Sequence, residues 1–362
     1  MLEKLIAASR RMDPDTAHKV VSLSTLGVIG PRLVESGVEV STLGMRGPWS
    51  VMGGFFRLVG ELRRQPAQTI VQTWMYHGDL LGGLAAWLAG RRRLVWNVRQ
   101  TGLLHNDVNR ATRVVARLCG WVSGWLPVRI VCNARSAIDI HAALGYGRAP
   151  FVVLPNGFDT EVFKRRPEAG AKLRRQWGID EGAFAFGLVA RLDPQKDHDN
   201  FIAAAKLVAR QLPQARFVLV GRGIASSPEL AASIGAADLA PQFVCLDQLE
   251  DMPAVMSALD VLCLSSRSEG FPNVLGEAMS CETPVVSTNA GDAASLVDDL
   301  ARIAPVANPQ ALADCMLRVA RLPQQDRQAL GLRDRQRIIQ NFGIAEVWVR
   351  YRALYTEVLR SR

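Results

Sequence analysis

Short runs of apolar residues alternate with amphipathic segments along the whole chain of 362 residues. The apolar runs are rich in Val, Ile, Leu and Phe and have the length of buried strands. Strands are predicted at 18–23, 38–43, 69–73, 94–98, 129–132, 151–154, 184–189, 215–220, 243–246, 261–264, 284–287 and 301–303.

Segments with helical periodicity separate these strands, as at 200–211, 252–259 and 309–321. This alternation predicts parallel sheets with helices on both faces. The strands are too many for one ordinary sheet, so we expect an α/β protein with two doubly wound, Rossmann-like domains. A turn-rich segment after the strand at 151–154 marks their junction, and the predicted domains are 1–155 and 156–343.

Two carboxylates stand eight residues apart where a predicted strand gives way to a helix. Glu269 follows the strand at 261–264, and Glu277 lies in the helical stretch 274–280. Open α/β sheets bind ligands at the carboxyl ends of their strands. Asn273 is a candidate helix cap, so the helix would aim its free N–H groups at the same place. Amides for an anionic group and carboxylates for hydroxyls are what a nucleotide sugar requires.

Two cations flank another strand-to-helix turn. Arg191 and Lys196 lie on either side of the Asp193-Pro194 break, after the strand at 184–189. A cation near a helix amino terminus is unfavourable unless an anion lies between them. A diphosphate would supply that anion, with arginine chelating two oxygens and lysine acting as a point charge. The alternative is a pair of solvated surface cations.

The strand at 215–220 runs into a glycine turn. Gly221 and Gly223 would let the backbone approach a ligand, although a single Gly-x-Gly is more often just a turn. The chain has no Gly-x-Gly-x-x-Gly, Walker loop or His-Glu-x-x-His. This argues against dinucleotide redox enzymes, P-loop ATPases and zinc proteases.

With the Asn156-Gly157-Phe158-Asp159 hinge, these residues resemble a family 4 glycosyltransferase of the GT-B fold, in which two Rossmann-like domains face a cleft. The resemblance is strongest over 183–290. It implies that Arg191 and Lys196 bind the donor diphosphate, that Glu269 contacts the donor sugar and that Glu277 binds the ribose hydroxyls. The remaining donor-site residues implied are Gly221, Gly270, Phe271 and Asn273.

The resemblance implies transfer of a sugar, with retention of anomeric configuration, from a nucleotide diphosphate sugar that we expect to be UDP-linked. It implies no metal or cofactor. The expected acceptor is a hydroxyl of a cell-envelope glycan, such as lipopolysaccharide, or of its lipid-linked precursor. Residues 344–362 should form a terminal helix that packs back on the first domain. A nucleotide-sugar epimerase of the same fold and a truncated, inactive nucleotide-sugar-binding protein remain as alternatives.

The acceptor side is less well defined. His77, in the segment 73–79 after a strand, resembles the histidine of the family's acceptor loop, although it could equally be a packing residue. In the segment 98–102, Arg99 stands where the family often has a histidine. An arginine cannot act as a general base, so we expect Arg99 to bind phosphate or an acidic acceptor.

The net charge of +9 is concentrated in the first part of the chain. Residues 1–155 hold 19 Lys+Arg against 9 Asp+Glu, whereas residues 156–362 hold 24 against 25. The imbalance implies an anionic partner for the first domain, and nucleic acid, acidic lipid and anionic glycan all qualify. A generally basic proteome explains it equally well. Of these partners, our prediction keeps the glycan and an anionic membrane surface and excludes nucleic acid.

A basic helical stretch at 109–125 offers one route to a membrane. Arg110, Arg113 and Arg117 recur on one helical face. Its apolar residues are Val114, Leu118, Trp121, Val122 and Trp125. Basic and aromatic residues on one helix can dock on an anionic membrane. The slightly favoured alternative is an apolar stripe that faces the core.

Two further expectations concern context. The chain starts with the helical stretch 1–8, where the family opens with a central strand and a Gly-Gly loop; we therefore expect a first strand to be missing. Six scattered cysteines without a Cys-x-x-Cys pair suggest reduced core thiols, and no signal peptide is recognised. We expect a cytoplasmic protein, peripheral to the inner face of the membrane.

Overall fold

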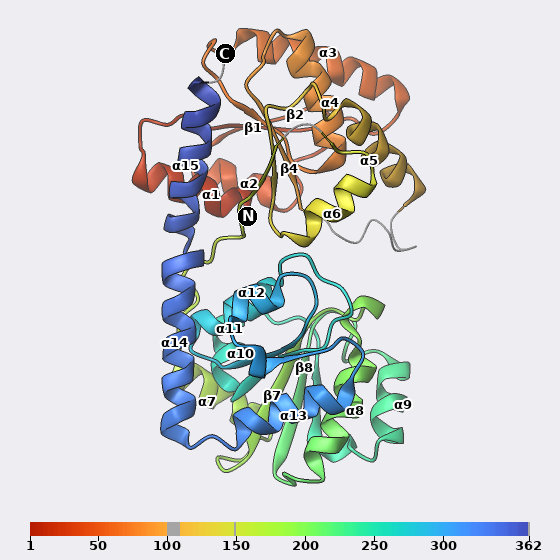
Figure 1. Cartoon of the computed structure of the whole chain (residues 1–362), viewed down its shortest axis with the longest axis vertical. Coiled ribbons are helices and arrows are strands. Elements are labelled where there is room, and N and C mark those ends of the chain that lie inside the picture. The colour runs from red at the N-terminus through yellow and green to blue at the C-terminus, as the bar shows by residue number, and fades with distance from the viewer. Residues whose placement is uncertain (100–108, 148–149, 361–362) are drawn as a thin grey trace. The chain divides into compact units, whose positions relative to one another are not determined.

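The computed structural model describes residues 1–99, 109–147 and 150–360, which form two compact units (Figure 1). Unit 1 comprises Met1–Gly157 and Ile344–Arg362, and unit 2 comprises Phe158–Gly343. All the predicted strands are confirmed, each within two residues of its expected ends. None of the helices in the described part of the chain is both long enough and apolar enough to span a bilayer.

Unit 2 is a doubly wound α/β domain. Its strands are β7 (Phe184–Val189), β8 (Ala215–Val220), β9 (Phe243–Leu246), β10 (Val261–Leu264), β11 (Val285–Thr288) and β12 (Ile303–Ala304). Its α-helices are α7 (Pro167–Gln176), α8 (His198–Ala209), α9 (Pro228–Ala236), α10 (Met252–Ala258), α11 (Asn273–Ser280), α12 (Ala293–Val297), α13 (Pro309–Ala320) and α14 (Gln324–Phe342). Short 3₁₀ turns lie at η2 (Pro194–Lys196), η3 (Ala240–Gln242) and η4 (Leu300–Arg302).

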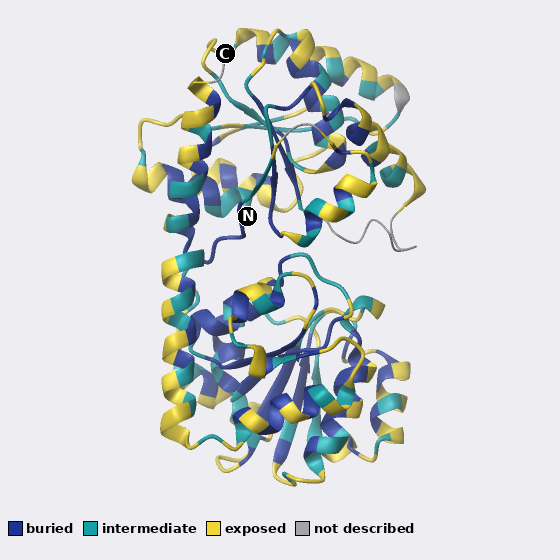
Figure 2. Ribbon diagram, viewed as in Figure 1, coloured by how far each residue is buried: buried dark blue, intermediate teal, exposed yellow. Residues whose placement is uncertain are grey.

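The six strands of unit 2 are parallel, in the order β12-β11-β10-β7-β8-β9. Their interiors are buried, and helices cover them on both sides, as the dark ribbons of Figure 2 show. Phe186 and Phe217 stack in the core beneath α8 and α13, with ring centroids 5.9 Å apart. Burial on both faces explains why these strands read as continuous apolar runs in the sequence.

Unit 1 is built from shorter strands. They are β1 (Lys19–Ser22), β2 (Glu39–Thr42), β3 (Val71–Gln72), β4 (Leu94–Val98), β5 (Arg129–Cys132) and β6 (Phe151–Val153). Its helices are α1 (Leu2–Met12), α2 (Ile29–Glu35), α3 (Pro48–Arg64), α4 (Met75–Leu88), α5 (Arg110–Val122), α6 (Ser136–Ala143) and α15 (Ile344–Arg360).

The strands of unit 1 form two separate parallel sheets within the described residues, β1-β2 and β3-β4-β5-β6. Every residue of β4 is buried, whereas the residues of β1 and β3 are partly exposed. A doubly wound sheet places its first strand between the second and the fourth. The free edges of β1 and β3 are the two that such a strand would join. Our expectation about that strand stays a prediction.

Alternate residues of β4 and β5 face two different helical layers. Trp96 and Ile130 pack towards α4 and α5. Val95 and Val131 pack instead against α1 and the terminal helix α15. Trp348 of α15 also donates a hydrogen bond from Nε1 to Oδ2 of Asp13, at 2.5 Å. Helix α15 is thus an integral layer of unit 1.

One carboxyl group lies in the core of unit 1, beside these layers. Asp79 on α4 is fully buried, and its Oδ1 accepts a hydrogen bond from Oγ1 of Thr73 at 2.5 Å. Among the described residues its Oδ2 has no hydrogen-bond partner. Burial raises the pKa of Asp79 to about 7, although hydrogen bonds from Thr73 and the Asn97 backbone oppose the shift.

The replacement Asp79→Asn should therefore stabilise the chain in a pH-dependent way. A raised pKa means that the folded chain binds more protons than the unfolded chain between about pH 4 and 7. The wild type consequently loses stability as the pH rises through that window, by up to about 4 kcal/mol. Asparagine is neutral throughout, so the advantage of the variant should grow from pH 4 to 8. Urea unfolding at several pH values, with the exposed Asp139→Asn as control, measures this advantage. A pH-independent difference would contradict the assignment.

Candidate functional site

The charged residues singled out in the sequence gather at one edge of the sheet in unit 2. Strands β7 and β10 are neighbours, and the strand order reverses between them. The loop 190–197 follows β7, and the loop 265–272 follows β10. Such a reversal leaves a crevice outside the carboxyl ends of the two strands, where α/β proteins bind ligands.

Three contacts fasten these loops to each other. Oγ of Ser265 donates to the carbonyl of Lys196 at 2.7 Å, and the backbone amide of Arg267 donates to the carbonyl of Gln195 at 2.8 Å. The guanidinium of Arg267 also binds the buried carboxylate of Asp197, with an Nε–Oδ2 distance of 2.7 Å. These contacts hold both loops in one arrangement before any ligand arrives.

Lys196 and Glu269 form an ion pair across the two loops. The Nζ of Lys196 lies 2.6 Å from Oε1 of Glu269. The same carboxylate oxygen accepts a hydrogen bond from Oγ of Ser266 at 2.7 Å. The side chains of Lys196 and Glu269 are only 23% and 12% exposed, so water screens the pair less than it would at the surface.

Arg191 is held by a carboxylate from its own loop. Its Nε and Nη2 donate to Oδ2 of Asp193 at 2.9 and 2.5 Å. The other oxygen of Asp193 accepts from the amide of Gln195 and caps the 3₁₀ turn η2. Burial tends to raise the pKa of Asp193, but the hydrogen bonds from Gln195 and Arg191 outweigh it and lower the pKa.

These pairs correct the premise on which the diphosphate was inferred. Arg191 and Lys196 are not uncompensated cations, because Asp193 and Glu269 neutralise them within the protein. Asp193 was visible in the sequence two residues after Arg191, and its role as a partner was missed. The alternative of two solvated cations is also wrong for Lys196, whose ammonium is largely enclosed.

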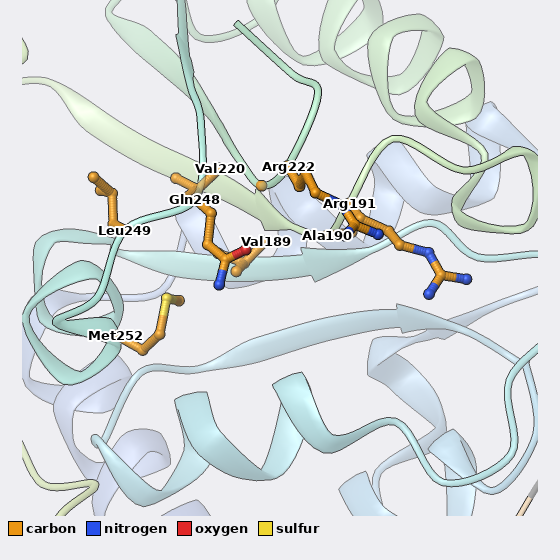
Figure 3. A pocket seen from close by; sticks show the side chains of 9 residues that line it. Val189, Ala190, Arg191, Val220, Arg222, Gln248, Leu249 and Met252 are labelled. Atoms are coloured by element: carbon orange, nitrogen blue, oxygen red, sulfur yellow. The ribbon is translucent and has the colours of Figure 1, made fainter. Parts of the chain in front are cut away.

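A pocket of about 350 Å³ lies beside Arg191 (Figure 3). It is lined by Val189, Ala190, Arg191, Val220, Gly221, Arg222, Gln248, Leu249 and Met252. Figure 3 shows Arg191 at one end of this group, with Leu249 and Met252 at the other. The sequence reasoning found Gly221 but missed the segment 248–252. Its place after β9, at the same edge of the sheet, was the signal available.

Gly221 is required where the ends of β7 and β8 approach. A Cβ on Gly221 would lie 2.0 Å from the carbonyl oxygen of Ala190, which no side chain can do. A second close approach lies at Gly291, where a Cβ would meet the carbonyl of Gly270 at 2.4 Å. The carbonyl of Gly270 also accepts a hydrogen bond from the Asp292 amide, at 3.0 Å, which fixes the backbone next to Glu269.

The remaining predicted donor residues lie along α11. Asn273 is the first residue of that helix, one position inside the cap, which is Pro272; the prediction of an Asn273 cap is therefore wrong. Glu277 lies one turn further along and is partly exposed. The side chain of Phe271 is buried against Phe158 and Phe342, with centroid distances of 6.1 and 5.8 Å. Phe271 thus has a packing role that its place in the motif did not reveal.

The two acceptor-side candidates differ in their surroundings. His77 is exposed in the first turn of α4, which excludes a packing role for its ring. Met75, the first residue of the same helix, lies in the left-handed region, at a φ of 66°. Backbone strain of this kind is found at functional sites more often than elsewhere.

Arg99, in contrast, is occupied within unit 1. Its guanidinium donates to Asn156 and to Oδ1 of Asn97, and it lies 5.1 Å from the ring centroid of Trp74. A longer contact of 3.4 Å reaches the hydroxyl of Tyr351 on α15. These contacts anchor α15 and the segment that leads out of unit 1. Residues 100–102, which follow it, lie outside the described part of the chain.

Two family models match the chain in succession. One, described as Glycosyltransferase Family 4, matches residues 6–162; the other, Glycosyl transferases group 1, matches residues 183–321. Solved structures with the same architecture include HepE of Anabaena in complex with UDP, at a TM-score of 0.83 and 20% identity, which aligns over 98% of this chain and 96% of its own. Sucrose-phosphate synthase of Thermosynechococcus elongatus aligns over 99% and 91%, at a TM-score of 0.73 and 17% identity. The fold is therefore GT-B.

The curated relatives are glycosyltransferases. The Escherichia coli UDP-Gal:alpha-D-GlcNAc-diphosphoundecaprenol alpha-1,3-galactosyltransferase is 28% identical, over 63% of this chain and 60% of its own. The 2-deoxystreptamine glucosyltransferase of Streptomyces kanamyceticus is also 28% identical, over 67% and 64%. The chain thus spans less than two thirds of the length of either relative. Together with the two models, these matches show that the chain belongs to the family 4 glycosyltransferases.

The close approach at Gly221 gives a test of the pocket's construction. Gly221→Ala should lower the free energy of unfolding by about 1–3 kcal/mol, because the new methyl group must push the ends of β7 and β8 apart. Gly235→Ala on α9 is the matched control, since its Cβ would meet open space. Alanine there should stabilise the helix by up to about 1 kcal/mol. Equal effects of the two replacements in urea unfolding would contradict the close approach of the strands at Gly221.

Proposed function

We propose that the chain transfers a sugar from a nucleotide diphosphate donor, UDP-linked, to a hydroxyl acceptor, with retention of anomeric configuration. The observation that carries this proposal is the Lys196–Glu269 pair at the reversal of the strand order. There an ammonium group and a carboxylate that can accept hydrogen bonds lie 2.6 Å apart. Arg191 and the 350 Å³ pocket lie at the same edge. One ligand that needs all of these is a nucleotide sugar.

The diphosphate would bind by taking the place of the carboxylates that now pair with Lys196 and Arg191. Lys196 and Arg191 each hold a carboxylate in the structure, and a phosphate oxygen can replace or share that carboxylate. The site is thereby neutral and organised before the donor binds, so little reordering is required. The pocket beside Arg191 has apolar walls at Leu249 and Met252, suited to the flat face of a base.

We assign the binding of the donor sugar and of the ribose to the two glutamates. Glu269 would accept hydrogen bonds from sugar hydroxyls, and Glu277 from the ribose hydroxyls. A uracil base is supported by the named donor of the Escherichia coli relative and by the UDP complex of HepE. A relative named as a GDP-mannose-dependent mannosyltransferase makes guanine the competing base.

In the proposed reaction the bond between C1 of the sugar and the β-phosphate oxygen breaks as the acceptor oxygen attacks C1 from the same face. The acceptor proton passes to the departing phosphate oxygen. Negative charge grows on the diphosphate, where Lys196 and Arg191 neutralise it. These cations make a metal unnecessary in our proposal.

The acceptor we propose is a cell-envelope glycan or a lipid-linked precursor presented at an anionic membrane. The diphosphoundecaprenol named in the acceptor of the Escherichia coli relative supports a lipid carrier. The excess of basic residues before residue 156 supports an anionic surface. His77, exposed at the start of α4, is our candidate for the acceptor side, while Arg99 would act there by holding Asn156, in the segment that leads out of unit 1.

The donor assignment is tested by UDP release from UDP-sugars. Lys196→Ala should lower kcat/KM by about 10²–10³, the loss expected for one group that stabilises charge in the transition state. Glu269→Gln keeps the size of the side chain but removes the charge, and should also reduce turnover strongly. The exposed Lys172→Ala and Glu181→Gln serve as matched controls that should match the wild type.

The other outcomes separate the alternatives. Release that persists in both site variants would refute the site assignment. UDP binding without release or conversion of the sugar, across a panel of acceptors, would support an inactive binding protein. Conversion of the donor sugar to its epimer would support an epimerase. Loss of release on chelation of divalent metals would contradict our metal-free mechanism.

A further inference from the structure

Helix α5 exposes its large apolar side chains. Trp121 is 81% exposed, Val114 56%, Trp125, just beyond the helix, 54% and Leu118 44%. The favoured expectation of an apolar stripe facing the core is therefore wrong for these four residues and right only for Val122. Figure 2 shows exposed segments along this helix.

The reason lies in the opposite face of α5, which carries small residues. Ala116, Cys119 and Gly120 are buried there. A Cβ on Gly120 would lie 2.4 Å from the carbonyl oxygen of Leu144, so the helix packs closely through its glycine. Small residues allow this approach, and the large apolar side chains are left outside.

Arginines share the exposed face. Arg110 and Arg117 are exposed and fall at the same helical spacing as Val114, Trp121 and Trp125. The helix contains no Asp or Glu. The face therefore presents indole rings and aliphatic side chains between positive charges, with no acidic residue from its own helix to neutralise them.

The end of α4 extends this face. The ring of Trp87 lies 5.9 Å from that of Trp125, edge to face. The guanidinium of Arg92 lies 5.5 Å from the Trp87 ring centroid. Trp87 and Leu88 are 41% and 43% exposed. We call the exposed residues of α5 and the end of α4 the aromatic face.

We propose that the aromatic face docks on the surface of an anionic bilayer. Tryptophan is favoured at the boundary of water and lipid, where its ring is apolar and its N–H stays hydrated. Arginine can bury its aliphatic stem among headgroups while its guanidinium binds lipid phosphates. Helix α5 would lie in the plane of the interface.

The charge pattern decides between a bilayer and a protein partner. Tryptophan and arginine are also enriched at interfaces between proteins, so these residue types alone do not separate the two partners. Their arrangement does separate them. Arginines alternate with the aromatic residues along one helix that has no Asp or Glu, and a bilayer surface offers anionic phosphates beside a shallow apolar layer. The inference deepens the proposed function by naming the residues that meet the membrane, and it rests on that function for its purpose.

The test is sedimentation of the whole chain with vesicles. Binding to vesicles of equal parts phosphatidylcholine and phosphatidylglycerol should far exceed binding to phosphatidylcholine alone, and should weaken as salt rises. Trp121→Ala should reduce binding about tenfold, since a fully buried aromatic ring contributes on that order. Arg117→Gln should reduce it about fivefold, the factor expected for one charge near an anionic surface.

Trp49→Ala on α3 is the matched control, because Trp49 is 83% exposed and belongs to a different helix. It should bind vesicles as the wild type does. An equal loss in Trp49→Ala, or equal binding to both kinds of vesicle, would overturn the proposal. Self-association that Trp121→Ala abolishes, without vesicle binding, would point instead to a protein partner and would also overturn it. Unfolding midpoints establish that each variant is folded.

Membrane docking and catalysis are separable in this design. Lys196→Ala should bind vesicles like the wild type although it loses UDP release, because Lys196 lies in unit 2 and outside the aromatic face. Release from the wild type without vesicle binding would refute docking alone. Vesicle binding without release from any UDP-sugar would refute the proposed function alone.

Discussion

The structure of unit 2 depends on one constraint, the reversal of strand order between β7 and β10. Parallel strands must be joined by crossovers, and a sheet that grows first to one side and then to the other sends the two crossovers away from each other. The loops after β7 and β10 are thus left uncovered at one edge, where Ser265 and Arg267 fasten them together. Lys196 and Arg191 and their carboxylate partners are all carried by these two loops. Their backbones are fixed by the sheet, so the position of Lys196 relative to Glu269 follows from topology as much as from electrostatics.

The site is electrically balanced by its own carboxylates. An isolated ammonium group, largely enclosed, would be unfavourable, and Glu269 offsets that desolvation. Asp193 does the same for the more exposed Arg191, as well as capping η2. A ligand with two phosphate groups can use both cations only by competing with groups already in place. Affinity for the proposed diphosphate would therefore be a difference between two sets of ion pairs, and this would favour a ligand that satisfies both cations together.

The strands were predictable because a strand that is buried on both faces appears in the sequence as a continuous run of apolar residues. The runs at 184–189, 215–220 and 261–264 match β7, β8 and β10 at both ends. The strand expected at 301–303 begins later, since the side chain of Asp299 caps the turn η4 over Leu300–Arg302. The position of the candidate site was predictable, because its charged residues follow the ends of β7 and β10 in the sequence. The pairing of Arg191 with Asp193 depends on rotamers that periodicity cannot show, and the orientation of α5 depends on the close contact at Gly120.

The order of events during synthesis follows from the way α15 completes unit 1. Val95 and Val131 are buried partly by residues of α15, more than 200 positions later in the chain. Residues 158–343 form unit 2 from one continuous stretch, and all of them leave the ribosome before α15 does. Unit 2 can therefore fold while unit 1 still exposes the part of this face of β4 and β5 that α15 covers. Helix α15 completes that face, so unit 1 finishes its core only after the whole of unit 2 has been synthesised.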